Sequence, residues 1–192
     1  MGRRGALDPS IRPVFARGRF LGPALTVWAG PRDNLAPYAA LTVARPGDVL
    51  VVATGAYIGS AVLGDLAIGM ARNSGIVAIV TDGHVRDIEG IEAVGIPVFA
   101  RGLTPNSPEK NGPGEVGGTI ALGGVPIGAG DLVAGDRDGV VVVPRARLAE
   151  VRAALEAVKQ KEVQMDAAVK DGLKHPTWLL EAMERRGVRW LD

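Results

Sequence analysis

Two predominantly apolar runs, residues 49–53 (VLVVA) and 76–81 (IVAIVT), constrain the fold of this chain more than any other feature. Each run is short and lacks polar alternation, so each is typical of a strand that is covered on both faces. A glycine-rich loop and a predicted helix ending near Ala71 separate the two runs. A short helix over 88–94 and a strand over 97–100 are predicted to follow. This alternation of strands and helices predicts right-handed crossovers in a parallel sheet, and hence the α/β class.

Further strands on either side of this core indicate that the sheet is mixed. Residues 22–29 (GPALTVWA) are a predicted strand and residues 35–44 a predicted helix. Residues 101–118 are rich in Gly, Pro and Asn, so we expect a long surface loop of a kind that is often functional. Three short strands are predicted next, and an Asp-Gly turn joins the last two as a hairpin: 119–122, 131–134 and 139–144.

The two ends of the chain are predicted to differ in structure. Residues 1–21 are basic and carry Pro9 and Pro13, so we expect an irregular lead-in. Residues 145–192 form a predicted helical segment, in which one long helix ends at Gly172 and a second, shorter one follows. A chain of 192 residues is long enough for one domain with a sizeable core, so we expect a single domain over 1–192.

Composition excludes several classes of function. The formal net charge is +1, from 22 basic and 21 acidic residues, so no global field favours a nucleic acid or a membrane surface. Neither a signal-like amino terminus nor an apolar run of about 18 residues is present, and we expect a cytoplasmic protein. With no cysteine and only two histidines, any metal would be bound by oxygen, which favours Mg²⁺ or Mn²⁺.

Charged residues gather in the stretch Gly55–Asp87, around the second apolar run. Asp65 is followed, about twenty residues later, by the adjacent pair Arg86 and Asp87. The pair comes just after a predicted parallel strand, where α/β sheets bind ligands. Two plainer interpretations stay open: Asp65 as a helix cap, and the pair as a surface ion pair of little energetic value. His84, in the same turn, is more often a solvated turn residue than a ligand.

The residue types in this stretch suit the binding of a small acid. A loop that leads into a helix exposes free backbone N–H groups. The segment that begins at Gly64 and Asp65 could therefore present the amides of Leu66 and Ala67 to a carboxylate. Arg86 offers a two-pronged donor for a carboxylate or an enolate oxygen. Asp87 can act as a monodentate ligand of a hard cation.

These residues resemble a known family. Asp65 followed by Asp82-Gly83-x-x-Arg86-Asp87 fits the D-x20-R-D pattern of class II pyruvate aldolases that act on 4-hydroxy-4-methyl-2-oxoglutarate and 4-carboxy-4-hydroxy-2-oxoadipate. The same fold family contains the regulator of ribonuclease E activity, type A, and proteins misnamed as menaquinone methyltransferases. The resemblance runs through nearly the whole chain, in the segments GPALTV, DNL, PGDVLVV and AGDLVAGDRDGVVVVP.

The resemblance implies a fold and an assembly. We expect a swivelling β/β/α-type domain with a mixed, partly parallel sheet and a long C-terminal helix. The family assembles as a homotrimer or homohexamer with active sites between subunits. A helix that often precedes the GPALTV strand in the family is absent or shortened here.

The resemblance also implies roles for individual residues. Asp87 would hold a divalent cation, Mg²⁺ or Mn²⁺, which also binds the keto and carboxylate oxygens of the pyruvyl part of a keto-acid substrate. Arg86 would stabilise the enolate oxygen, and Asp65 would orient a water molecule. Glu162 would complete the site from the C-terminal helix of an adjacent subunit. A solvated glutamate beside Lys161 is the plainer interpretation of that position.

Three functions from different classes follow from these observations. The first is a metal-dependent lyase that releases pyruvate from 4-hydroxy-2-oxo acids and decarboxylates oxaloacetate through the same enolate. The second is a regulator of ribonuclease E without dedicated catalysis. The third, a quinone methyltransferase, would need a GxGxG nucleotide loop after its first strand, whereas the glycine loop here leads to Asp65. The sequence favours the lyase.

Overall fold

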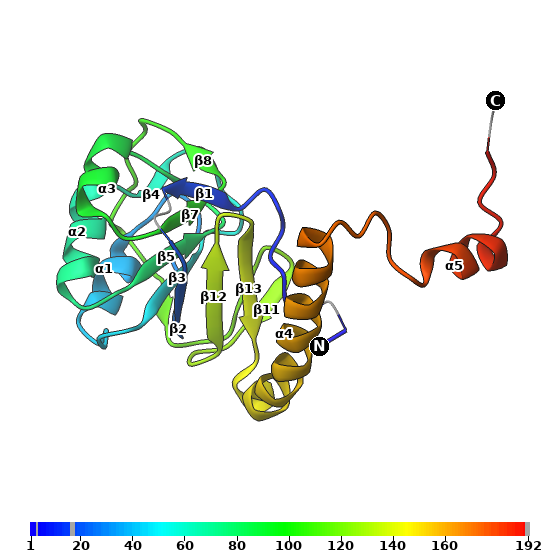
Figure 1. Ribbon diagram of the computed structural model, residues 1–192. Helices are drawn as coiled ribbons and strands as arrows, with labels where there is room; N and C mark the ends of the chain where they lie inside the picture. The colour runs from blue at the N-terminus through cyan, green and yellow to red at the C-terminus, as the bar shows by residue number, and fades with distance from the viewer. Residues whose placement is uncertain (3, 16–17, 191–192) are drawn as a thin grey trace. The chain divides into compact units, whose positions relative to one another are not determined.

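The computed structural model describes residues 1–2, 4–15 and 18–190 of the chain (Figure 1). The chain divides into two compact units, Met1–Leu148 and Ala149–Asp192. Of the elements in the described residues, the first unit contains the strands and three α-helices, and the second contains most of a long helix and a short one. The single domain over residues 1–192 stays a prediction.

The main sheet of the first unit is mixed, as predicted. Four neighbouring strands run parallel, and antiparallel strands flank them at both edges. The order is β1 (Arg12–Phe15), β7 (Val98–Ala100), β5 (Ala78–Thr81), β3 (Val49–Ala53), β2 (Phe20–Trp28), β12 (Leu132–Asp136) and β13 (Gly139–Val143), with β9 (Glu115–Val116) pairing with β2. The last two strands of this order form the predicted hairpin, in which Asp136 faces Gly139.

Both faces of the parallel strands are covered, which explains their continuous apolar sequence. Helices α1 (Leu35–Leu41), α2 (Asp65–Asn73) and α3 (Ile88–Val94) lie together on one face (Figure 1). Because side chains alternate along a strand, β3 divides its residues between two cores. Leu50 and Val52 pack beneath the helices, whereas Val49, Val51 and Ala53 pack on the opposite face.

The opposite face is covered by strands. A small hairpin of β10 (Ile120–Leu122) and β11 (Val125–Ile127) places buried apolar side chains in that core. Phe20 and Phe99 meet there with ring centroids 5.4 Å apart and planes tilted by 59°. Apolar burial on both faces of the sheet is the main force that holds the unit together.

A second, small parallel sheet extends the parallel strands toward the candidate site. It consists of β4 (Ala61–Leu63), β6 (His84–Val85) and β8 (Gly102–Leu103). These strands follow β3, β5 and β7 in the chain, so each continues beyond the carboxyl end of a main-sheet strand. The polar residues that follow β4, β6 and β8 are therefore brought to the same side of the unit.

Several predictions of irregular structure were wrong in part, because the glycine loop before Asp65 contains β4 and the turn over 82–87 contains β6. The lead-in over 1–21 is not irregular throughout, because it contains β1 and the start of β2. Pro13 is tolerated in β1 because that strand is at the edge of the sheet and pairs with β7 alone. The predicted loop over 101–118 contains the two-residue strands β8 and β9. In each case the pairing partner is distant in sequence, so the local pattern gives little signal.

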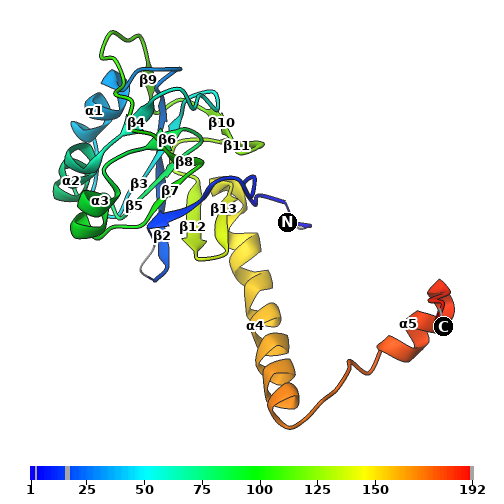
Figure 2. The same cartoon turned by 90° about the horizontal axis from the view of Figure 1, so that it is seen from above.

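The long C-terminal helix is confirmed. A single 3₁₀ turn (Arg145–Arg147) precedes α4 (Leu148–Lys170), and α5 (Leu179–Arg186) follows (Figure 2). Gly172 has a φ of 94°, a left-handed conformation that favours glycine and ends the helix as predicted. Across the residues that the structure describes, no helix combines the length and apolar content needed to cross a membrane.

Candidate functional site

Arg86 and Asp87 lie in the turn between β6 and α3, beyond the carboxyl end of β5. Arg86 Nε is 3.2 Å from Asp87 Oδ2, and the side chains are 34% and 46% exposed. Arg86 Nη1 also donates a hydrogen bond to Ser107 Oγ. The guanidinium is therefore held from two directions, and these two contacts use two of its five N–H groups.

Asp87 adopts a backbone conformation that is unusual for a residue with a side chain. Its φ and ψ angles are 64° and 53°, in the left-handed region, where it caps the start of α3. Such a conformation costs on the order of 1–3 kcal/mol and is concentrated at binding and catalytic sites. The observed strain supports a functional role for the pair, although aspartate tolerates this region better than most residues.

Gly64 allows α2 to approach this pair closely. It caps α2, and a Cβ atom at this position would lie 2.6 Å from Asp87 Oδ2 and 3.2 Å from Arg86 Nε. Any larger residue would displace the charged side chains. The glycine that the sequence places before Asp65 therefore has a steric function at the site.

Asp65 is the first residue of α2, and its carboxylate faces α3. Its Oδ1 accepts a hydrogen bond of 2.7 Å from the Leu66 amide, which is one of the orphan donors of the helix. A side chain on Gly90 of α3 would collide with the Asp65 carboxylate. The interpretation of Asp65 as the helix cap is therefore wrong, because Gly64 occupies the N-cap position and Asp65 is the first residue of the helix. The Asp65 carboxylate nevertheless binds a backbone donor of the first turn and lies at the site.

The predicted residues of the first unit converge. A pocket of about 150 Å³ is lined by six of them: Gly64, Asp65, Leu66, Ala67, Arg86 and Asp87. A second, wider cavity of about 600 Å³ shares Arg86 and Asp87 and continues along Ile88, Glu89 and Leu103. The charged pair thus lies where a small polar pocket meets a larger, more open space.

Five further residues line the small pocket and were missed from the sequence: Asn34, Tyr38, Ser107, Pro108 and Lys110. Asn34 is 4% exposed, and its Oδ1 has no hydrogen-bond partner among the described residues. Lys110 adds a second cation to the pocket. The sequence offered only weak indications of these residues. Asn34 belongs to the DNL segment, and Ser107, Pro108 and Lys110 lie in the loop over 101–118 that was expected to be functional.

The other charged residues of the sequence motif have different positions. Asp82 is buried, and its carboxylate accepts hydrogen bonds from the amides of Thr54 (2.6 Å) and Ala56 (2.8 Å) and from the Thr54 hydroxyl. It therefore ties the end of β5 to the loop after β3. His84 is in β6 and is not among the residues that line either cavity. Its interpretation as a solvated turn residue is wrong, because its Nδ1 is buried without a hydrogen-bond partner among the described residues. Glu162 is exposed on α4, in the second unit, and its role stays a prediction.

The donor set suits a loosely held hard cation. Among the described residues, no three Asp, Glu or His side chains form a ready metal-binding group. Asp65 and Asp87 supply two carboxylates to one pocket. Mg²⁺ is usually held by one or two carboxylates together with water and substrate oxygens, so Asp87 as the single protein ligand, with Asp65 in the same pocket, is compatible with such an ion.

Comparison with known proteins assigns the chain to a family. The family model described as RraA-like, Aldolase/RraA, matches residues 1–142. The chain belongs to the RraA-like family. A Halalkalibacterium halodurans member, provisionally named 4-hydroxy-4-methyl-2-oxoglutarate aldolase, is 38% identical over 180 residues, which cover 92% of this chain and 84% of that protein.

Solved structures of RraA-like proteins agree with this assignment. The RNA-processing inhibitor RraA of Thermus thermophilus is 31% identical, with a TM-score of 0.68 over 72% of this chain and 84% of that one. A Streptomyces coelicolor member of the RNase ES inhibitor RraA family is 31% identical, with a TM-score of 0.73 over 86% of each chain. The names of RraA-like relatives thus include both an aldolase and inhibitors. The names alone do not decide between an enzyme and a regulator, so the choice for this chain depends on the chemistry of the pocket.

Proposed function

We propose that this RraA-like protein is a divalent-metal-dependent lyase. It would cleave 4-hydroxy-2-oxo acids of the 4-hydroxy-4-methyl-2-oxoglutarate type to pyruvate and would decarboxylate oxaloacetate as a side reaction. The observation that carries this proposal is the guanidinium of Arg86, fixed by Asp87 and Ser107 at a pocket that Asp65 also lines. The aldolase name of the Halalkalibacterium relative supports the same reaction class.

The aldol cleavage and the decarboxylation both form the enolate of pyruvate, and therefore the same negative charge on its oxygen. When the bond between C3 and C4 of the substrate breaks, its electron pair moves into the enolate of pyruvate. The C4 hydroxyl loses its proton and becomes a carbonyl in the aldol cleavage, whereas oxaloacetate releases carbon dioxide. A proton is then added at C3 to give pyruvate. Arg86 would stabilise the enolate oxygen, and removing one such donor costs roughly 10²–10³ in rate.

The remaining residues of the pocket would bind the substrate and manage its protons. The Ala67 amide, with Lys110, would receive the substrate carboxylate. The Leu66 amide would join them once the substrate carboxylate replaces Asp65 Oδ1 as its hydrogen-bond acceptor. Asp65 would orient the water molecule that takes the C4 hydroxyl proton. Asp87 would hold Mg²⁺ or Mn²⁺, and that ion would supply Lewis-acid polarisation of the 2-oxo group.

The second candidate is a regulator of RNA processing. It is favoured by the names of the Thermus and Streptomyces proteins, which are each 31% identical to this chain. A regulator without dedicated catalysis would release no pyruvate from these substrates. Metal-dependent turnover therefore separates the two candidates.

The experiment measures pyruvate release by the purified wild-type protein. Oxaloacetate or 4-hydroxy-4-methyl-2-oxoglutarate is supplied with Mg²⁺ or Mn²⁺, and lactate dehydrogenase reports the pyruvate formed. We expect release from both substrates and its loss on addition of EDTA. Release that EDTA leaves unchanged would contradict the metal requirement, and no release from either substrate by folded protein would favour the regulator.

A further inference from the structure

Asp33 connects two segments that are distant in sequence. It lies in the turn before α1, where its Oδ1 accepts a hydrogen bond of 2.8 Å from the Leu35 amide. Its Oδ2 accepts two more, from the amides of Asn111 (2.6 Å) and Gly112 (3.0 Å). One carboxylate thus satisfies three backbone donors and joins this turn to the loop that follows β8.

Backbone pairing strengthens the same connection. The Asn34 amide donates to the Glu109 carbonyl at 3.0 Å, and the Glu109 amide donates to the Arg32 carbonyl at 2.7 Å. The side chains of Arg32 and Glu109 also form an ion pair at 3.6 Å. The loop is therefore fastened to the turn at residues 109, 111 and 112.

The fastened residues are close neighbours in sequence of residues that line the small pocket. Ser107 and Lys110 both line it, on either side of Glu109 in sequence, and the Ser107 hydroxyl accepts the hydrogen bond from Arg86. Asp33 is not among the lining residues. A change at Asp33 can therefore reach the pocket only through the loop or the turn that it connects.

We propose that Asp33 is a positioning residue of the active site, which clamps residues 107–112 so that Ser107 and Lys110 are held beside Arg86. This inference deepens the proposed lyase function and rests on it for its kinetic consequences. The clamp itself is a structural property, so it can be measured in a protein of any function.

The protonation state of Asp33 suits this role. Burial acts to raise the pKa of the carboxyl, but hydrogen bonds from the amides of Leu35, Asn111 and Gly112 outweigh it and hold the pKa below its ordinary value. The side chain is therefore an anionic acceptor at neutral pH. Replacement by asparagine puts an NH₂ donor where one acceptor oxygen stood, so the side chain can no longer accept all three bonds.

The matched control is Asp131, whose carboxylate also accepts hydrogen bonds from backbone amides, elsewhere in the first unit. Its Oδ2 accepts from the Gly128 amide and its Oδ1 from the Arg145 amide, both at 2.8 Å. Asp131 lines neither cavity at Arg86. Asp131→Asn therefore loses equivalent bonds without loosening the loop.

The test combines amide hydrogen exchange with steady-state kinetics on oxaloacetate. We expect Asp33→Asn to accelerate exchange at residues 109–112 and to lower kcat/KM by about tenfold, because bonds to charged acceptors are among the stronger ones. Asp131→Asn should change neither quantity. If Asp33 acts through Ser107, the losses in Asp33→Asn and Ser107→Ala should be less than additive in the double variant.

Two results would overturn the clamp. Unchanged exchange at residues 109–112 in Asp33→Asn would show that the carboxylate does not hold the loop. Faster exchange with an unchanged kcat/KM would show that the loop does not position the site. If the wild-type protein releases no pyruvate, the lyase proposal fails on its own, and the exchange measurement still decides whether Asp33 holds the loop.

Discussion

The contact between Arg86 and Asp87 has features that stability alone does not explain. A partly exposed ion pair contributes about 0–1 kcal/mol. Against this, Asp87 occupies the left-handed region, and Gly64 must lack a side chain for α2 to approach. Strained or sterically restricted residues are expected where a ligand is bound. At the scale of single residues, the arrangement is best explained by the chemistry proposed for Arg86.

Replacing Arg86 tests that chemistry. We expect Arg86→Ala to lower kcat for oxaloacetate by about 10²–10³, because the developing enolate loses a fixed donor. Arg72→Ala, at the exposed C-terminal end of α2, is the matched control and should retain wild-type kcat. Circular dichroism should show both variants folded. Equal turnover in the two variants would remove Arg86 from the mechanism.

Replacing Gly64 tests the close approach of α2. The new Cβ atom of Gly64→Ala would lie 2.6 Å from Asp87 Oδ2, so we expect that carboxylate to shift and Mn²⁺ activation to require at least about tenfold more metal. Gly69→Ala is the control on the same helix, because its Cβ would make only ordinary contact with Val94 at 3.6 Å. A Mn²⁺ titration compares the two. Coinciding titration curves for Gly64→Ala and the wild-type protein would contradict the assignment of Asp87.

At the scale of elements, apolar runs bounded by turn residues and short helices with a regular pattern were predictable, whereas strands that depend on a distant partner were not. The strand over 49–53 and the helix over 88–94 were predicted with the bounds that the structure has. By contrast β1, β4 and β9 have four residues or fewer, and their partners, which are distant in sequence, determine them more than their own residues do.

The same distinction applies to the candidate site. Asp65 and the pair at 86–87 converge because β3 and β5 are parallel neighbours, which the sequence predicts. The positions of Ser107 and Lys110 depend on hydrogen bonds between Asp33 and a loop 78 or 79 residues further along the chain. A single sequence carries no signal for such a connection, so these residues were missed.

The stability that Asp33 contributes by holding residues 107–112 should also depend on pH. Because the folded state holds the pKa of Asp33 below its ordinary value, the unfolded state binds more protons as the pH falls. The stabilisation is therefore present above the unfolded pKa, about 3.9, and is lost as the pH falls through the lower folded pKa. We expect the free energy of unfolding to decrease less below about pH 4 in Asp33→Asn than in the wild-type protein. Urea unfolding at pH 6, 4 and 3 measures this, and parallel decreases would contradict the role of Asp33.

At the scale of the whole molecule, the exposed residues of α4 suggest how copies of the chain associate. None of its residues is buried, and its exposed apolar side chains include Leu155, Val158, Met165 and Val169. Several exposed apolar side chains on one helix are typical of a surface that associates with another protein. We propose that the protein is a homotrimer or homohexamer in which α4 contacts another copy and Glu162 completes the site of that neighbour.

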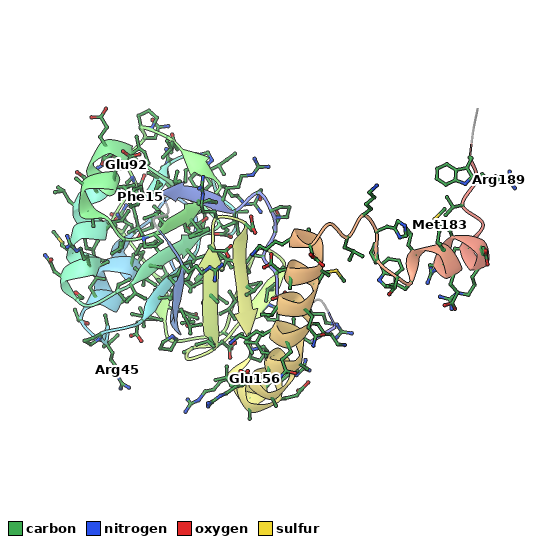
Figure 3. All side chains as sticks on the ribbon, viewed as in Figure 1. Phe15, Arg45, Glu92, Glu156, Met183 and Arg189 are labelled. Atoms are coloured by element: carbon green, nitrogen blue, oxygen red, sulfur yellow. The ribbon has the colours of Figure 1, made fainter. Side chains whose placement is uncertain are left out.

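Light scattering and one variant test this assembly. We expect the mass of three or six chains, and we expect Glu162→Gln to lower kcat by at least about tenfold if it supports proton transfer. Glu156→Gln is the control on the same helix; Glu156 is labelled in Figure 3 and pairs with Lys159 at 3.9 Å. A monomer with full activity would contradict both the assembly and the role of Glu162.

The formation of the pyruvate enolate is the central claim, and deuterium exchange measures it directly. An enzyme that stabilises this enolate must also form it from pyruvate, by removing a proton from the methyl group. In D₂O with Mn²⁺, we expect the wild-type protein to exchange the methyl protons of pyruvate, as followed by mass spectrometry, and we expect EDTA or Arg86→Ala to abolish the exchange. Folded wild-type protein that exchanges no faster than buffer with Mn²⁺ would contradict the account.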